Sequence, residues 1–106
     1  MPKYLAKATY STDGLKGLIN EGGSSRRDAI TAAIASVGGT VESLYFAFGE
    51  DDLYVIFDVP ERSGAIALGL NIAAAGAIGW STTALLTPQE IDDAVGIDVE
   101  YRAPQA

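Results

Sequence analysis

Two short apolar runs, at residues 45–48 and 53–57, flank an acidic turn, a pattern typical of two β-strands joined by a tight turn. We predict one strand over residues 40–48 and the next over 53–59, with the acidic residues 49–52 forming the hairpin between them. Pro60 lacks the N–H that a strand ladder needs, so the second strand should end before it.

Helical spacing accounts for much of the remaining chain. Apolar residues from Ile30 to Val37 recur at the spacing of one helix face. Ser25, with Asp28 three residues later, resembles a capping box and predicts the start of this helix. The other predicted elements are strands over 3–10 and 78–86, and helices over 11–21, 62–75 and 87–96.

The order of these elements is β-α-β-β-α-β, followed by a late helix. This order predicts a single α+β domain over residues 1–106, with a ferredoxin-like antiparallel sheet and helices on one face. Residues 97–106 are expected to form either a short edge strand, over Ile97 to Arg102, or a frayed tail.

Both faces of the predicted hairpin are largely apolar. One row contains Tyr45, Ala47, Tyr54 and Ile56, and it lies opposite the row that would face the helices. A sheet face that contacts water is normally polar. We therefore predict a homodimer or higher homo-oligomer with these four residues at the interface. The alternative is that the two tyrosine hydroxyls suffice to hydrate this face.

Charge and composition restrict the possible functions. The formal net charge of −7 disfavours nucleic acid and anionic membranes as partners. The absence of cysteine and histidine excludes disulfides, thiolate catalysis, Cys-ligated zinc and a Ser-His-Asp triad. We therefore expect neither a metal nor a cofactor, and acid–base chemistry would fall to carboxylates, tyrosine or lysine.

The stretch from Gly64 to Leu86 has no charged residue and is long enough to span a bilayer. It is rich in alanine and glycine, and its second half alternates like a strand. These features favour a helix and a strand buried in a soluble core. The N-terminal residues 1–5 lack the basic and apolar regions of a signal peptide, so we expect a cytoplasmic location.

Several short motifs together resemble the bacterial GYD domain family over about residues 1–95. The motifs are Met1-Pro-Lys-Tyr-Leu, Gly14-Leu-Lys-Gly-Leu, Glu21-Gly-Gly-Ser-Ser-Arg-Arg, Phe46-Ala-Phe-Gly-Glu-Asp-Asp, Tyr54-Val-Ile-Phe-Asp-Val-Pro and Thr82-Thr-Ala-Leu-Leu-Thr-Pro. The resemblance implies a ferredoxin-like fold of the dimeric α+β barrel type, and it implies no activity. The family often has an aromatic at the hairpin position of Asp51, so any role of that aromatic is left open here.

Arg26 and Arg27 follow two glycines at the expected start of a helix, in a chain with seven basic residues. Backbone N–H groups at such a position can bind an anion. The pair is therefore a candidate site for a carboxylate or phosphate of a small ligand, or for an acidic group of a second subunit. The alternative is a surface pair bridged to neighbouring acids such as Glu21.

Aromatic residues form a second candidate site, because a cleft between sheet and helices could stack a planar ligand. Its alternative is ordinary core packing. The members are Tyr4, Phe46, Phe48, Phe57 and Trp80, and Tyr54 is added as a further ligand contact.

Lys7 and Asp58 are charged residues within strands that this fold makes neighbours. They form a candidate ion pair, either for proton transfer or for structure alone. The acidic runs 50–52 and 92–93 lack the spacing of a calcium-binding loop, and we expect them to be solvated.

These observations lead to three functional hypotheses. The first is a binding module for a small apolar anion, held between sheet and helices. The second is a cofactor-free isomerase or monooxygenase-like enzyme that acts on a planar substrate. The third is a structural or assembly subunit. The sequence does not decide whether the protein is an enzyme.

Overall fold

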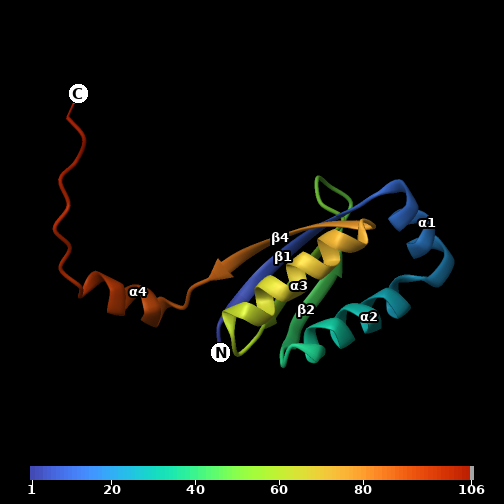
Figure 1. The fold of residues 1–106 in the computed structure, drawn as a ribbon, viewed down its shortest axis with the longest axis horizontal. Coiled ribbons are helices and arrows are strands. Elements are labelled where there is room, and N and C mark those ends of the chain that lie inside the picture. Colours follow the sequence, from blue (N-terminus) through green and yellow to red (C-terminus); the bar gives the residue numbers. More distant parts are fainter. Residues whose placement is uncertain (106) are drawn as a thin grey trace.

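A computed structural model describes residues 1–105 as a four-stranded antiparallel sheet with helices on one face (Figure 1). The strands and helices follow the predicted ferredoxin-like order, and both helices predicted before β2 and the late helix are present. The elements are β1 (Lys3–Tyr10), α1 (Thr12–Glu21), α2 (Gly23–Ser36), β2 (Thr40–Phe46), β3 (Leu53–Asp58), α3 (Arg62–Ala75), β4 (Ile78–Leu85) and α4 (Pro88–Val95).

The strand order is β2-β3-β1-β4, which is the ferredoxin-like arrangement. β1 lies in the centre, where Ala6 pairs with Val55 of β3 and with Thr82 of β4. β2 and β4 are the edge strands, and β2 carries an irregularity between Val41 and Ser43. The sheet therefore has one bulged edge and one regular edge.

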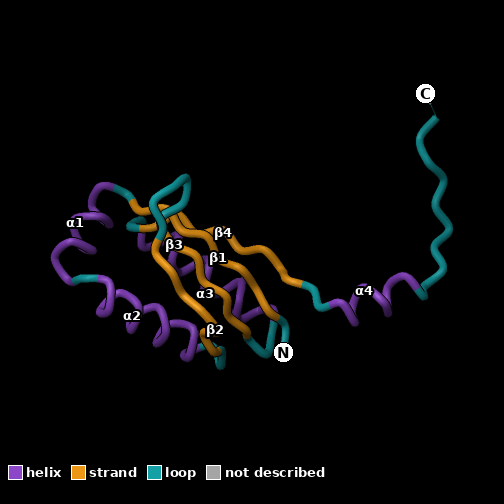
Figure 2. The backbone as a smooth tube through the Cα atoms, turned by 180° about the vertical axis from the view of Figure 1, so that it is seen from behind, coloured by secondary structure: helices purple, strands orange, loops and turns teal. Residues whose placement is uncertain are grey.

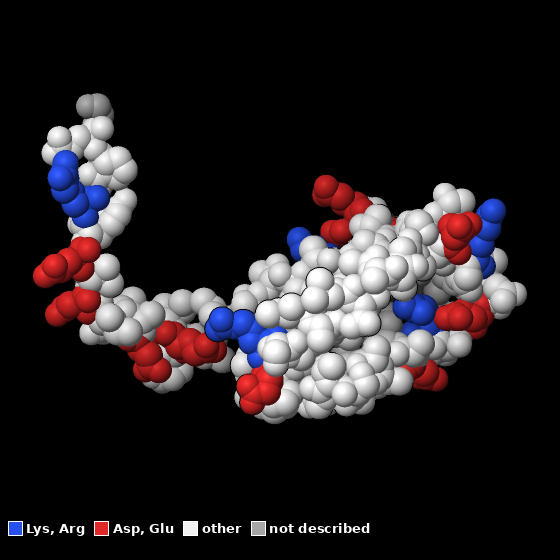
Figure 3. All heavy atoms as spheres, in the orientation of Figure 1, with Lys and Arg blue, Asp and Glu red and all other residues white. Residues whose placement is uncertain are grey.

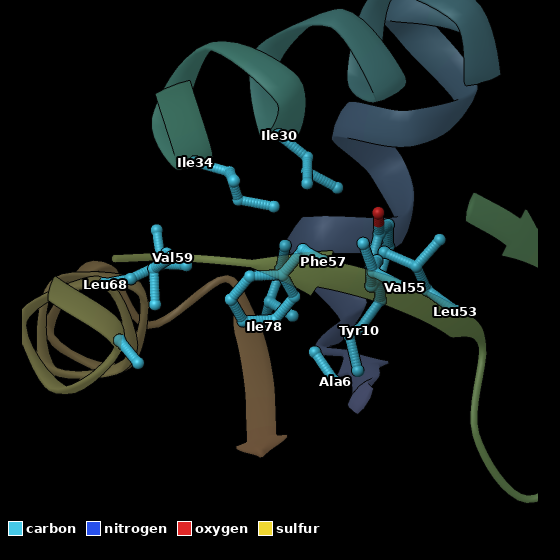
Figure 4. Close-up of a cluster of buried hydrophobic side chains, with 12 residues drawn as sticks. Ala6, Tyr10, Ile30, Ile34, Leu53, Val55, Phe57, Val59, Leu68 and Ile78 are labelled. Atoms are coloured by element: carbon cyan, nitrogen blue, oxygen red, sulfur yellow. The ribbon is translucent and has the colours of Figure 1, made fainter. Parts of the chain in front are cut away.

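The core lies between the sheet and helices α2 and α3. Alternate residues of β3 are buried, as the sequence alternation predicted, and Phe57 is its largest fully buried side chain. Ile30 and Ile34 of α2 and Leu68 of α3 reach this layer from the helices (Figure 4). The core also contains Ala6, Ala8, Tyr10, Leu53, Val55, Val59, Ala65 and Ile78.

The other face of the sheet is left open by residues 1–105. Figure 2 views the molecule from this side, with the strands in front and α3 behind them. Tyr45 of β2 and Tyr54 of β3 are cross-strand partners on this face. Tyr45 is 73% exposed. Of the predicted row, Tyr45 is exposed, Tyr54 and Ile56 are half-buried, and Ala47 lies beyond the end of β2.

The start of α2 differs from the prediction. The helix begins at Gly23 with Gly22 as its N-cap, and no side chain caps it. Ser25 therefore lies inside the first turn, and the predicted capping box with Asp28 is wrong. Gly22 has a φ of 85°, a left-handed conformation that suits glycine and lets α1 turn directly into α2.

β2 is shorter than predicted, because it ends at Phe46. Beyond it the chain turns at once, with Ala47 donating to the carbonyl of Asp52 at 2.9 Å. Phe48 lies in this turn and is fully exposed. The prediction that Phe48 lines a cleft is therefore wrong.

The C-terminal region leaves the body of the molecule (Figure 1). Its helix α4 has the predicted capping box, in which Thr87 and Glu90 cap each other reciprocally. Residues 98–105 have no regular structure, so the edge strand predicted over Ile97 to Arg102 is not formed within the described chain.

The uncharged stretch 64–86 is divided between α3 and β4. Among residues 1–105, no helix has both the length and the apolar character needed to cross a membrane.

Candidate functional site

A groove of about 340 Å³ runs between α2 and α3. The two helices come together at one end, where a Cβ added to Gly64 would lie only 3.3 Å from the Cβ of Val37. They leave space toward the other end, near Arg26 and Ala75. The wall is mostly apolar. It is formed by Ala33, Val37, Ala67, Leu68, Ile72, Ala75, Ala77 and Ile78, with Ser36 and Asn71 as its neutral polar members.

Arg26 is the one charged residue among those that line this groove. Its Nε atom is buried and has no hydrogen-bond partner in the described chain. A buried donor of this kind normally has a partner. The unpaired Nε therefore marks a position where an acceptor from outside the chain would be stabilised.

Tyr10 ends β1 on the core face and lies beside Arg26. Its hydroxyl is also buried without a hydrogen-bond partner of good geometry among residues 1–105. Burial raises the pKa of Tyr10, and the nearby positive charge of Arg26 opposes this effect in part. The hydroxyl consequently remains protonated at neutral pH and is available as a donor.

A smaller hollow of about 130 Å³ adjoins Tyr10 and Arg26 between α1 and β4. Arg26 lines both this hollow and the larger groove. Gly14 and Glu21 of α1 also line the hollow. The guanidinium thus stands between two adjoining spaces, and α1 closes the far side.

Arg27 has a different environment from its neighbour. It is exposed, and its Nη2 lies 3.1 Å from Oδ1 of Asp28. The structure therefore separates the two candidate arginines. Arg26 belongs to the groove, and Arg27 is a surface residue bridged to Asp28 rather than to Glu21.

Tyr4 and Trp80 lie in a second groove, of about 300 Å³, between α3 and β4. Both rings contact Phe57, with centroid distances of 5.6 Å to Tyr4 and 6.3 Å to Trp80. The Nε1 atom of Trp80 is buried and unpaired within the described chain. These aromatics therefore pack on the core edge, away from Arg26.

Tyr54 lies on the open face of the sheet, paired with Tyr45. It therefore does not belong to a site between sheet and helices, and the expectation that it joins Tyr4, Arg26 and Trp80 there is corrected.

The predicted ion pair between Lys7 and Asp58 is also corrected by the strand register. Asp58 lies opposite Lys3, whereas Lys7 lies opposite Tyr54, four positions farther along the ladder. Lys3 donates to Oε1 of Glu42 at 2.6 Å, which raises the pKa of Lys3, with a smaller contribution from Asp58. The sheet thus gives Asp58 a different lysine as its neighbour.

The acidic hairpin is attached to β1. The backbone N–H of Tyr10 donates to Oδ2 of Asp52 at 2.8 Å, and the Thr9 hydroxyl donates to Asp51 at 3.4 Å. Among residues 1–105, no three acidic side chains gather in a way that could hold a metal ion. Asp51 and Asp52 thus act as acceptors that fix the turn.

Tyr10 and the groove residues Ser36 and Asn71 were not identified as site residues from the sequence. The available signal was the position of Tyr10 as the last core-facing residue of a strand, a place where its hydroxyl needs a partner. Ser36 and Asn71 carry no signal of this kind, because serine and asparagine are common on helix surfaces.

Comparison with known proteins gives a single finding about the family. The model of the GYD domain matches residues 4–95. No curated protein and no solved structure matches the chain at a significant level. The matched segment runs from β1 through α4 and so includes both grooves. Since it covers most of the 106 residues, the chain belongs to the GYD domain family.

Proposed function

We propose that this protein binds a small apolar anion in the groove between α2 and α3. The observation that carries the proposal is the buried and unpaired Nε of Arg26 at the open end of an apolar groove. A carboxylate is the preferred ligand group, because guanidinium and carboxylate form strong charge-assisted hydrogen bonds.

The charge distribution supports an anionic ligand at this position. The chain has a net charge of −7, so an anion is repelled from most of the surface. Arg26 is not among the groups that form ion pairs within residues 1–105, so no carboxylate of the described chain pairs directly with its charge. The Tyr10 hydroxyl offers a second donor beside it.

The groove supports an apolar body of modest size. A volume of about 340 Å³ is at the lower end of the range for small-molecule sites. The apolar wall between Val37 and Ala77 favours a hydrocarbon or aromatic group. Medium-chain fatty acids and aromatic carboxylic acids have this combination of a single charge and an apolar body.

Binding is favoured over catalysis by the chemistry of the groove wall. Within the described part of the chain, Arg26 is the only ionisable residue of the groove wall, and an arginine side chain cannot serve as a general base. Tyr10 stays protonated as well. The enzyme hypothesis therefore has less support than a binding role.

A thermal-shift series tests this proposal with matched ligands. Hexanoate, octanoate and benzoate should raise the Tm, because a ligand that binds only the folded state stabilises it. Hexanol, octanol and benzyl alcohol are the controls, since they keep the apolar body and lack the charge. Equal shifts with acids and alcohols, or no shift with any acid, would refute the proposal.

We further propose that the protein forms a homo-oligomer through the open face of the sheet, using Tyr45, Ala47, Tyr54 and Ile56. The support is that residues 1–105 leave this face uncovered, with Tyr45 73% exposed and its cross-strand partner Tyr54 half-buried. Tyr45→Asp should weaken this contact, seen in light scattering as a lower average molar mass than that of the parent chain, and Asn20→Asp, on the exposed surface of α1, is the matched control. A monomeric parent chain would contradict this second proposal.

A further inference from the structure

The C-terminal arm, defined as residues 86–105, has apolar residues that the rest of the chain does not cover. The radius of gyration is 17.0 Å, compared with about 13 Å for a compact domain of this length. The figures show why, because the arm extends away from the sheet (Figures 1 and 2). Its exposed apolar residues are Leu86, Ile91, Val95, Ile97, Val99 and Tyr101.

The second half of the arm has the pattern of a strand. Ile97, Val99 and Tyr101 alternate with charged residues, so an extended backbone places all three on one side. In the structure this segment has no strand partner within residues 1–105. An amphipathic strand without a partner exposes both its backbone groups and its apolar row, which favours pairing with another strand.

The outer edge of β4 is the complementary surface. Between Ile78 and Leu85 there is no charged residue and no proline, the features that normally protect an edge strand. The other edge, β2, carries Glu42 at a bulge, which disfavours pairing. Beside β4 lies the groove that it forms with α3, where Ile66 and Leu70 are 55% and 65% exposed.

Chain geometry directs the arm to another molecule. Only Leu86 and Thr87 separate β4 from α4, and the eight residues of α4 carry the chain about 12 Å farther. The six residues 97–102 reach at most about 20 Å. If residues 97–102 turned back to β4 of the same chain, most of them would be needed to cover the distance. Few would then remain to pair with β4.

The charges of the two surfaces are also complementary. Residues 86–105 contain five acidic residues and one arginine, a net charge of −4. Among residues 1–105, Arg62 is the only charged residue that lines the groove between α3 and β4. In Figure 3 acidic side chains gather along the arm, while the middle of the body is largely uncharged.

We propose that the arm of one chain docks on a second copy of the chain. Residues 97–101 add a strand to the outer edge of β4, and their apolar row covers Ile66 and Leu70 of α3. This inference deepens the proposed self-association and is independent of anion binding. It adds a second contact, on a different part of the surface from the open sheet face.

Cysteine cross-linking in the full chain tests the inference. The chain has no cysteine of its own, so only the introduced cysteines can form disulfides. A Val99→Cys chain is mixed with a Thr82→Cys chain that carries a size tag, and both are oxidised mildly. The control replaces Thr82→Cys with Lys16→Cys, which is exposed on α1. Docking should make the first cross-link form at least about tenfold faster than the control, since it raises the local thiol concentration.

A double variant with both Val99→Cys and Thr82→Cys shows whether the arm docks on its own chain or on a second copy. A disulfide that joins two chains supports docking on a second copy, and one that forms within a monomer overturns it. Equal cross-linking rates for Thr82→Cys and Lys16→Cys also overturn it.

Light scattering of the parent chain separates the two proposals on self-association. An oligomer without the specific cross-link refutes the arm contact and leaves the sheet-face contact standing. A monomer refutes both.

Discussion

The Tyr10 hydroxyl lies beside the Arg26 guanidinium where β1, α1 and α2 meet, and each residue has a buried polar atom without a partner among residues 1–105. Unpaired buried donors destabilise a fold by about 1–3 kcal/mol each. The charge of Arg26 and its side-chain contact with the Tyr10 hydroxyl offset part of this cost. An external acceptor beside Arg26 would meet more than one donor. The predictions below begin with this pair.

Tyr10 should ionise later than a tyrosine in water, because burial raises its pKa above 10.0 in the folded state. The folded protein then holds this proton more tightly than the unfolded chain. The resulting stability is fully present below about pH 10 and is lost as the pH rises through the folded pKa. A spectrophotometric titration of tyrosinate at alkaline pH should therefore show a late component.

Tyr10→Phe should remove this late component, whereas Tyr45→Phe should leave it in place. Tyr45 is the matched control because it is 73% exposed, compared with 7% for Tyr10. If both variants lose the same part of the titration curve, the assignment to Tyr10 is incorrect.

Gly14 and Gly17 should respond in opposite ways to replacement by alanine, although both lie in α1. A Cβ at Gly14 would lie 2.2 Å from the carbonyl oxygen of Ala77, which already accepts hydrogen bonds from Ser11. Gly14→Ala should therefore lower the free energy of unfolding by about 1–3 kcal/mol. At Gly17 the same atom meets nothing within 4 Å. Gly17→Ala should raise stability by up to about 1 kcal/mol.

Urea unfolding of the two variants measures this difference. A Gly14→Ala protein as stable as the parent would show that α1 does not pack closely on residue 77. Because α1 closes the hollow beside Arg26, Gly14→Ala should also weaken anion binding.

Phe57 and Phe48 should differ sharply in their contribution to stability. Phe57 is 1% exposed in the centre of the core, and Phe48 is fully exposed in the hairpin turn. Phe57→Ala should destabilise the fold by about 3–5 kcal/mol. Phe48→Ala should change stability by less than about 0.5 kcal/mol. A large loss with Phe48→Ala would place its ring in a contact that this structure does not contain.

The fold was largely predictable from local patterns. The alternation in β3 and the signals at Thr87 and Pro88 specify strand and helix by chemistry that acts over a few residues. The start of α2 could not be predicted in this way, because Gly22, with its positive φ, stands where a side-chain cap was expected. Such a choice depends on how α1 and α2 pack, which no short motif contains.

The candidate site was predictable only in part. Arg26 could be selected by its type, yet its separation from Arg27 depends on which helix face turns inward. Lys3 rather than Lys7 is the neighbour of Asp58 because of the register between β1 and β3, two strands distant in sequence whose alignment no local motif determines. Tyr10 belongs to the candidate site because the fold places it beside Arg26, which is distant in sequence.

The central claim is that Arg26 holds an apolar carboxylate, and isothermal titration calorimetry with octanoate tests it most directly. Arg26→Met removes the charge in the groove, and Arg27→Met removes the same charge from the adjacent surface position. Loss of one charge-assisted hydrogen bond predicts a Kd at least about tenfold weaker for Arg26→Met, and an unchanged Kd for Arg27→Met. Equal affinities of both variants and the parent chain, or no binding by the parent, would contradict the account.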